Sequence, residues 1–279
     1  MSTVSWMVCK AFLAKQEDRR QAALLPFLSQ HRLEGLRDLP PTFQDASKGF
    51  SAPLAKIDPS WFEQFLRSQP KSEISLFLAA LTDSQASALK ERLLYANHLF
   101  PLTKHAKRFL QKNLLEQIVP HDILPVECLP ESPLNSLLTI EPKKLKKLCQ
   151  LLGLHDLAFE LQKVIDTKHL KQVQALLPKD EFDLLKKFQK EKDLSGFARL
   201  NLDQYKGDLI QLLFTRGLNR LAKALHGENS SLIWHITRRM DREDANTLTN
   251  LSSPLEQKGA HALLTAQVVE ITSYLQEKP

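Results

Sequence analysis

The chain has 279 residues, enough for two or three helical modules at roughly 100–200 residues per domain. Eight glycines, fifteen prolines and 7% aromatic residues argue against a sheet protein and favour an all-helical one interrupted by prolines. The net charge of +6 and the pI near 9.1 permit contact with an acidic protein, a nucleic acid or an anionic membrane surface, without choosing among them.

The N-terminal part is expected to hold one helix, from Glu17 to His31. The stretch DLPPTFQDASKGFSAP that follows is typical of a linker, because prolines and small polar residues favour turns. We therefore predict an N-terminal helical segment and linker over residues 1–52.

Residues 53–124 are predicted to form a middle helical module. In FLRSQPKSEISLFLAAL, a proline separates a short apolar helix from a longer one. Thr82 or Asp83 can cap the third helix, DSQASALKERLL, and another is expected from His105 to Ile118. The apolar positions of the second helix follow helical spacing, at Ile74, Phe77, Leu78 and Leu81.

A proline-rich linker is predicted over residues 125–136, which overlap the stretch VPHDILPVECLPESP, residues 119–133. The C-terminal module, residues 137–279, contains leucine stripes at helical spacing, interrupted by Pro, Asp or Gly residues that we interpret as breaks between degenerate helical repeats. Pairs of short antiparallel helices cannot bury their apolar faces alone and usually stack. The predicted fold is thus all-α, with armadillo/HEAT-like right-handed superhelical modules.

The sequence contains no arrangement typical of catalysis. A glycine-rich phosphate loop, an H-E-x-x-H motif and a nucleophile elbow are all absent from it. The nine histidines are scattered, and Cys9, Cys128 and Cys149 lack the spacing of metal ligands. We therefore expect no enzymatic activity, no catalytic residue, no cofactor and no metal.

A cytoplasmic location is expected from the same sequence. An odd number of cysteines fits a reducing compartment, and MVCKAFL is too short for the core of a signal peptide. No apolar run reaches the ~18 residues that a membrane-spanning helix requires. Any membrane contact is expected to come through partner proteins.

Two basic clusters, Thr103–Arg108 and Lys143–Lys147, keep a nucleic-acid-binding protein open as an alternative. Single-strand binders interleave basic residues with stacking aromatics, whereas the apolar neighbours here are leucines expected to face a core. A solvated helical surface is the favoured interpretation.

Trp234 lies in SLIWHITRRMDRED, where Leu232, Ile236 and Met240 form one apolar stripe. Ile233 and Trp234 widen the apolar arc beyond what one core contact needs. A core tryptophan is favoured, and a docking anchor stays open because tryptophan is enriched among interface hot spots.

Two segments together resemble FliG-type flagellar motor switch proteins. Ser68, Gln69, Pro70 and Lys71 stand where the middle domain of that family has a Glu-His-Pro-Gln signature. Leu221–Leu248 is similar to the C-terminal domain, and VVEITSYLQEK to the family's final helix. The residues in register in the second segment are Leu221, Ala222, Ala224, Leu225, Gly227, Leu232, Met240, Ala245 and Leu248.

The departures from the family concern its motor function. Where the resemblance places charged residues that face the stator, this chain has Ile233, Trp234 and His235 on one helix and residues 249–251 (Thr, Asn, Leu) on the next. The family's interdomain glycine pair is also missing. Without these charges, electrostatic coupling to a stator is poorly supported.

The resemblance therefore implies a relative that assembles without generating torque. The favoured interpretation is a non-enzymatic adaptor of a bacterial type III secretion sorting platform, of the K type (SctK), linking the inner-membrane ring to platform proteins at the cytoplasmic face of the membrane. A flagellar switch subunit remains an alternative, and no small-molecule substrate is expected. The predicted partner-binding residues are Arg67, Gln69, Pro70, Lys71, Ile233, Trp234 and His235.

Overall fold

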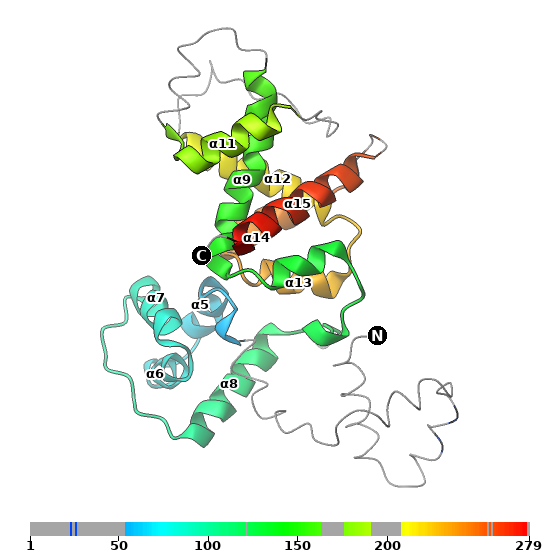
Figure 1. The fold of residues 1–279 in the computed structure, drawn as a ribbon. Helices are drawn as coiled ribbons and strands as arrows, with labels where there is room; N and C mark the ends of the chain where they lie inside the picture. The colour runs from blue at the N-terminus through cyan, green and yellow to red at the C-terminus, as the bar shows by residue number, and fades with distance from the viewer. Residues whose placement is uncertain are drawn as a thin grey trace. The chain divides into compact units, whose positions relative to one another are not determined.

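The computed structural model describes residues 23, 26, 54–120, 122–162, 176–190, 208–255, 257 and 259–277 (Figure 1). Every element assigned within these ranges is an α-helix or a 3₁₀ helix, so the predicted all-α class is confirmed. The superhelical stacking stays a prediction with which these helices are compatible. The expected helix Glu17–His31 and its linker lie almost entirely outside the described residues.

The chain divides into two compact units. Among the described residues, 54–55 and 66–130 belong to unit 1, whereas 56–65 and 131–277 belong to unit 2. Helix α5 (Ser60–Arg67) spans the division along the chain. Unit 1 continues with α6 (Lys71–Ala80), α7 (Asp83–Leu93), α8 (Lys104–Ile118) and the 3₁₀ helix η3 (Val126–Cys128).

In unit 1, α6 packs against both α7 and α8. Thr82 is the residue that caps α7, and its side chain and that of Gln85 form a reciprocal capping box. Buried Gln111 of α8 donates through Nε2 to the carbonyl of Ala80, at 2.8 Å, and so satisfies a carbonyl at the end of α6. The predicted apolar face of α6 is confirmed at Ile74, Leu78 and Leu81, which are buried.

The described part of unit 2 contains the start of α5, the 3₁₀ helix η4 and six further helices. The helix η4 begins inside the region predicted as a linker, residues 125–136, and ends two residues beyond it. Leu134 in this helix is fully buried. The elements are η4 (Pro133–Leu138), α9 (Pro142–Leu161), α11 (Lys179–Phe188), α12 (Leu209–Ala224), α13 (Ser230–Thr237), α14 (Arg242–Leu251) and α15 (Ala260–Glu277), together with the start of α5.

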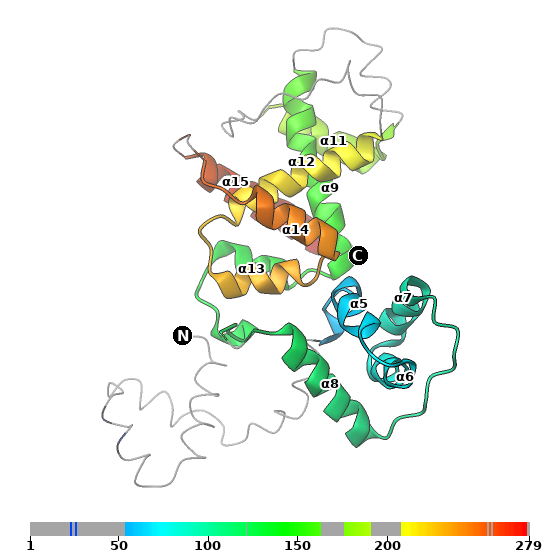
Figure 2. The ribbon, with the colours of Figure 1, turned by 180° about the vertical axis from the view of Figure 1, so that it is seen from behind.

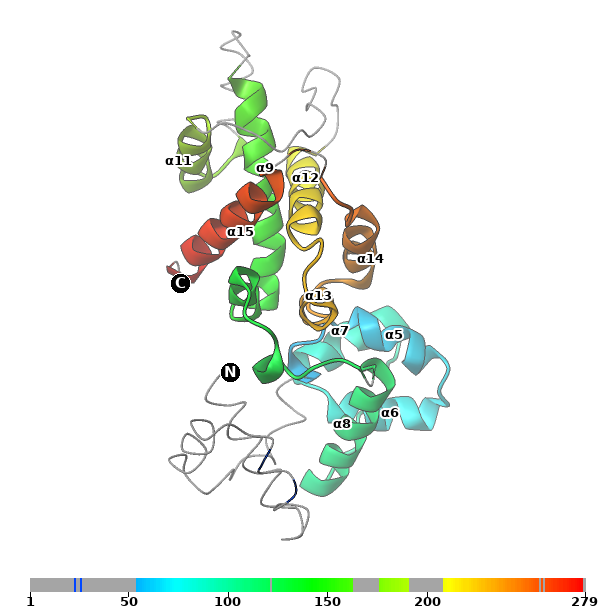
Figure 3. The same ribbon diagram turned by 90° about the vertical axis from the view of Figure 1, so that its right-hand side faces the viewer.

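Helix α9 is the centre of unit 2. It contacts α11, α12 and α15. Figure 3 shows α9 between α12 and α11, with α14 on the outer side of α12. Seen from behind in Figure 2, α12 crosses in front of α9. Residues 151–158 are all buried, because neighbouring helices cover α9 on several sides. The sequence pattern predicts breaks between repeats at some Asp and Gly residues of the C-terminal module. That prediction is wrong for Gly153 and Asp156, since both lie inside this continuous helix.

Two glycines allow α9 and α12 to cross in close contact. A Cβ added to Gly153 would overlap the backbone of Leu213, and one added to Gly217 would overlap the carbonyl of Cys149. Glycine therefore occurs inside these helices because the crossing leaves no room for a side chain, and the closer packing offsets its poor helix propensity.

Candidate partner-binding site around Trp234

The start of α5 is tied to the turn between α13 and α14 in unit 2. The indole Nε1 of Trp61 donates to the carbonyl of Met240 at 3.1 Å. The backbone N–H of Asp58 donates to the carbonyl of Arg238 at 2.8 Å, and that of Arg242 donates to Oγ of Ser60 at 2.9 Å. These three bonds join segments about 180 residues apart, so they fix Trp61 beside the turn.

The guanidinium of Arg238 is stacked on an indole. Its Cζ lies 3.6 Å from the centroid of the Trp61 ring and 5.3 Å from that of Trp234. The Cζ of Arg242 lies 5.8 Å from the Trp61 ring. Cations attracted to the ring face in this way are held in orientation by the indole quadrupole.

Both arginines lack an anionic partner in the part of the chain that the structure describes. No hydrogen bond or ion pair reaches the guanidinium of Arg238 or of Arg242 there. Burial, followed by the charge of Arg242, lowers the pKa of Arg238 to about 10. Arg238 thus remains charged at neutral pH, although its partial burial and its neighbour both disfavour the charge.

The predicted partner-binding residues on α13, Ile233, Trp234 and His235, are each half-buried. The Trp234 and His235 rings meet edge to face with centroids 5.0 Å apart. The indole Nε1 of Trp234 is buried and makes no hydrogen bond with any described residue. Trp234 is therefore neither a wholly buried core residue nor a freely exposed one.

The stripe on the other face of α13 is confirmed as core. Leu232, Ile236 and Met240 are buried, and they fix which side of the helix faces the interior. Arg239 is buried too and donates to the carbonyls of Leu137 and Ile140, at the end of η4. Burial lowers the pKa of Arg239, and the two carbonyls satisfy donors that water no longer reaches.

The other predicted residues lie on the Pro70 turn of unit 1. Arg67, Pro70 and Lys71 are exposed and Gln69 is half-buried. The carbonyl of Pro70 accepts from the N–H groups of Glu73 and Ile74, at 2.9 and 3.0 Å, so the turn starts α6. Arg67 donates through Nη2 to the carbonyl of Arg92 at 3.1 Å. These contacts account for the turn as a helix boundary, and its role in binding stays a prediction.

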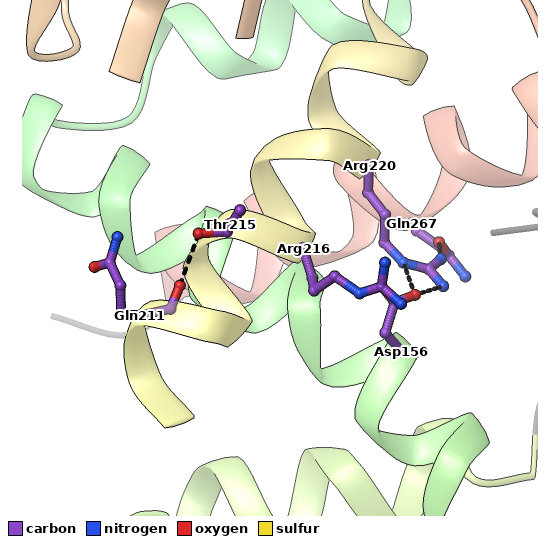
Figure 4. A network of polar contacts seen from close by, with 6 residues as sticks. All are labelled: Asp156, Gln211, Thr215, Arg216, Arg220 and Gln267. Carbon is purple, nitrogen blue, oxygen red and sulfur yellow. Dashed lines mark hydrogen bonds and ion pairs between the residues drawn. The ribbon is translucent and has the colours of Figure 1, made fainter. Parts of the chain in front are cut away.

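A buried polar network joins α9, α12 and α15 (Figure 4). Fully buried Arg220 donates through Nε to Oδ1 of Asp156, and through Nη1 to Oε1 of Gln267, both at 2.9 Å. Nε of Arg216 lies 3.0 Å from Oδ2 of the same aspartate. The carboxylate is thus occupied on both oxygens, which suits a structural role better than proton transfer.

The orientation of Gln267 extends this network to His155. Because Arg220 can only donate, the amide oxygen of Gln267 must face it, and Nε2 of Gln267 then donates to Nδ1 of His155 at 3.2 Å. His155 also stacks on Phe188 of α11, with ring centroids 3.8 Å apart. The polar contacts therefore connect α9, α12 and α15, and ring stacking adds α11.

The two basic clusters differ in their surroundings. In Lys143–Lys147, Nζ of Lys144 donates to the carbonyl of Leu275 at 3.0 Å and Lys147 pairs with Glu181, so part of this cluster is used within unit 2. In the other cluster, Lys104 and Arg108 are exposed beside Phe109, whose side chain is 63% exposed. The sequence reasoning missed this exposed aromatic.

Metal-ligand clusters and membrane-spanning helices are both absent from the ranges that the structure describes. No group of three or more His, Cys, Asp or Glu side chains there is placed to hold a metal ion. None of the helices in those ranges is long and apolar enough to cross a membrane.

Sequence reasoning identified Trp234 but not the residues that surround it. Arg238 lies only four positions after Trp234, and its guanidinium reaches both indoles. Trp61, the ring beside which Arg238 and Arg242 lie, comes from a distant segment, which periodicity cannot reveal. The available signal was the density of arginines in TRRMDRED, which begins three positions after Trp234. Comparison with protein-family models, with curated proteins and with solved structures finds no match.

Proposed function

We propose that the protein is a non-enzymatic adaptor that binds other proteins, and specifically a K-type adaptor of a bacterial type III secretion sorting platform. The platform assignment is supported by the resemblance of Phe65–Leu81 and Leu221–Leu248 to the two domains of FliG-type switch proteins, in the same order. The adaptor would link the inner-membrane ring to platform components.

One observation carries the proposal: Ile233, Trp234 and His235 are half-exposed side by side on α13, with arginines beside them. The resemblance expects stator-facing charges at these positions. Tryptophan and arginine are enriched in interface hot spots, and charged residues are depleted from interface cores. The exchange of charge for aromatic and apolar surface therefore favours stable assembly over electrostatic coupling.

Affinity purification from native cells after mild crosslinking tests this function. We expect the wild-type protein to recover an inner-membrane ring subunit together with platform proteins, in low and high salt. Trp234→Ala should lose them while retaining its helical circular dichroism, and Leu94→Ala, which shortens an exposed apolar side chain of unit 1, serves as the control. Unchanged recovery with Trp234→Ala would remove this site from the model.

A nucleic-acid-binding function is the second candidate, because Phe109 is exposed between Arg108 and Lys112 on α8. Basic side chains that alternate with an exposed aromatic suit stacking on single-stranded nucleic acid. Anisotropy of a labelled single strand should then show binding that weakens steeply with salt. Loss of that binding in Phe109→Ala, with Trp234→Ala unaffected, would favour this function over the adaptor.

A further inference from the structure

We propose that Arg238 and Arg242 form a site for a carboxylate of an acidic segment in a partner protein. The inference rests on the proposed adaptor function, since it names the chemistry of the group that α13 and the following turn would receive.

Stacking on Trp61 leaves one edge of the Arg238 guanidinium available. The ring covers one face at 3.6 Å, and Nε is buried without a hydrogen-bond partner. The terminal nitrogens are not among the buried atoms that lack a partner, and no described residue bonds to them, so they meet solvent. Two parallel N–H groups on a fixed plane match the two oxygens of a carboxylate.

The rest of the local structure holds that plane in place. Trp61 is anchored by its bond to the carbonyl of Met240. The carbonyl of Arg238 accepts from the N–H of Asp58, and the N–H of Arg238 donates to the carbonyl of Trp234. A preorganised donor loses less conformational freedom on binding than a free surface arginine does. Burial, followed by the charge of Arg242, lowers the pKa of Arg238, and a bound anion would offset both effects.

The surrounding charges favour a carboxylate over a polyphosphate chain. Asp58, Asp241 and Glu243 lie close enough to Asp244 to raise its pKa, and they border the same turn. A nucleic acid would bring several charges past these aspartates and glutamates, whereas one or two carboxylates can reach the arginines alone. The half-buried indoles of Trp61 and Trp234 beside Arg238 also suit the apolar neighbours of an acidic residue in a protein segment.

The indole N–H signals in a ¹H–¹⁵N NMR spectrum of the full chain provide the test. Trp61→Phe and Trp234→Phe assign the signals, because the chain has only three tryptophans. The probe is a synthetic peptide with two glutamates four positions apart among leucines, added in about 150 mM salt so that long-range attraction is screened. Its glutamine counterpart, inorganic phosphate and a single-stranded oligonucleotide are titrated in parallel.

We expect the glutamate peptide to shift the Trp61 and Trp234 signals to saturation. Arg238→Gln should weaken this binding by about tenfold or more, because it removes a charge-assisted contact with two bonds. Arg242→Gln, at the edge of the ring, should weaken it less. Lys143→Gln, which removes one exposed charge elsewhere in unit 2, should leave it unchanged.

The site would be overturned by absence of saturation, by equal binding of the glutamine peptide, or by tighter binding of phosphate or the oligonucleotide. Equal binding by wild type and Arg238→Gln would also overturn it, provided that both retain their unfolding temperature. The two proposals can fail independently. If platform proteins are recovered but the glutamate peptide does not bind, only this site is wrong. If the peptide binds as expected and no platform protein is recovered, only the adaptor function is wrong.

Discussion

Gly217 of α12 lies directly against the backbone of Cys149 in α9, so that a Cβ on Gly217 would overlap the Cys149 carbonyl. Gly153 has the same relationship to Leu213. The two helices that form most of the interior of unit 2 are therefore held at a separation that only glycine permits.

Replacing either glycine should destabilise unit 2. The overlapping atoms belong to backbone, which cannot rotate away, so the helices must separate and core contacts are lost. We expect Gly217→Ala or Gly153→Ala to lower the free energy of unfolding by about 1–3 kcal/mol or more, measured by urea denaturation. Thr215→Ala on the exposed face of α12 should change it by less than about 0.5 kcal/mol. A stability gain in Gly217→Ala, as expected for an exposed helix, would contradict the close crossing.

Removing one partner of the Asp156–Arg220 pair should be more harmful than removing both. Asp156→Asn leaves the buried guanidinium of Arg220 without a counter-charge, and the expected loss is about 3–5 kcal/mol. The double variant Asp156→Asn/Arg220→Met should be more stable than the sum of the single losses predicts. Urea denaturation of all four proteins in this double-mutant cycle gives the coupling, and additive losses would contradict it.

Asp244 provides a pH-dependent prediction. Burial, Asp241, Glu243 and Asp58 raise the pKa of Asp244 above its ordinary value of 3.8, and Lys146 opposes them. The folded state thus binds this proton more tightly than the unfolded chain, so ionising Asp244 destabilises the fold as pH rises from 3.8 through the raised pKa. Asp244→Asn should unfold at a higher urea concentration than wild type near neutral pH.

That advantage should vanish as the pH falls below the ordinary pKa of 3.8, where both side chains are neutral. Glu116→Gln on α8 is the control, because it breaks an exposed ion pair with Lys112 that contributes little. A variant less stable than wild type near neutral pH would show that Asp244 is stabilising when charged.

The two described cysteines should react at different rates. Cys128 is exposed, whereas Cys149 is buried and burial, followed by the charge of Asp244, raises the pKa of its thiol. Since the thiolate is the nucleophile, iodoacetamide at pH ~8 should modify Cys128 in the native protein and Cys149 only after denaturation. Peptide mass spectrometry distinguishes them, and rapid native labelling of Cys149 would mean that the α9–α12 contact opens.

The spacing of apolar residues predicted helices correctly, because a helix with one buried face has a periodic pattern within a short stretch of sequence. The spacing predicted α6, in which Ile74, Leu78 and Leu81 are buried. The residue types before α7 indicated Thr82 as one of two possible caps, and Thr82 is the cap. Sequence reasoning failed at Gly153 and Asp156, where local propensity indicates a break. The partners that keep these residues inside α9, Leu213 and Arg220, lie more than fifty positions away in the sequence.

The candidate site was predictable only in part for a similar reason. Trp234 was visible as an aromatic that widened an apolar arc, and its ring lies against the nearby His235 and Arg238. The pairing of Arg238 with Trp61 joins residues far apart in sequence, and no motif links them. A single aromatic at helical spacing can indicate that a surface is unusual without indicating which charges accompany it.

Unit 2 is discontinuous in the chain, because residues 56–65 belong to it and the described part of unit 1 from 66 to 130 is inserted before its remainder. The ribosome adds Trp61 to the chain long before Met240, so the hydrogen bond between them cannot form until the later segment has been made. Such non-local closure slows folding. A C-terminal fragment that starts at Glu131 would lack the stack on Arg238 and the donors to Met240 and Arg238, whereas one that appends residues 56–65 through a short flexible linker would restore them.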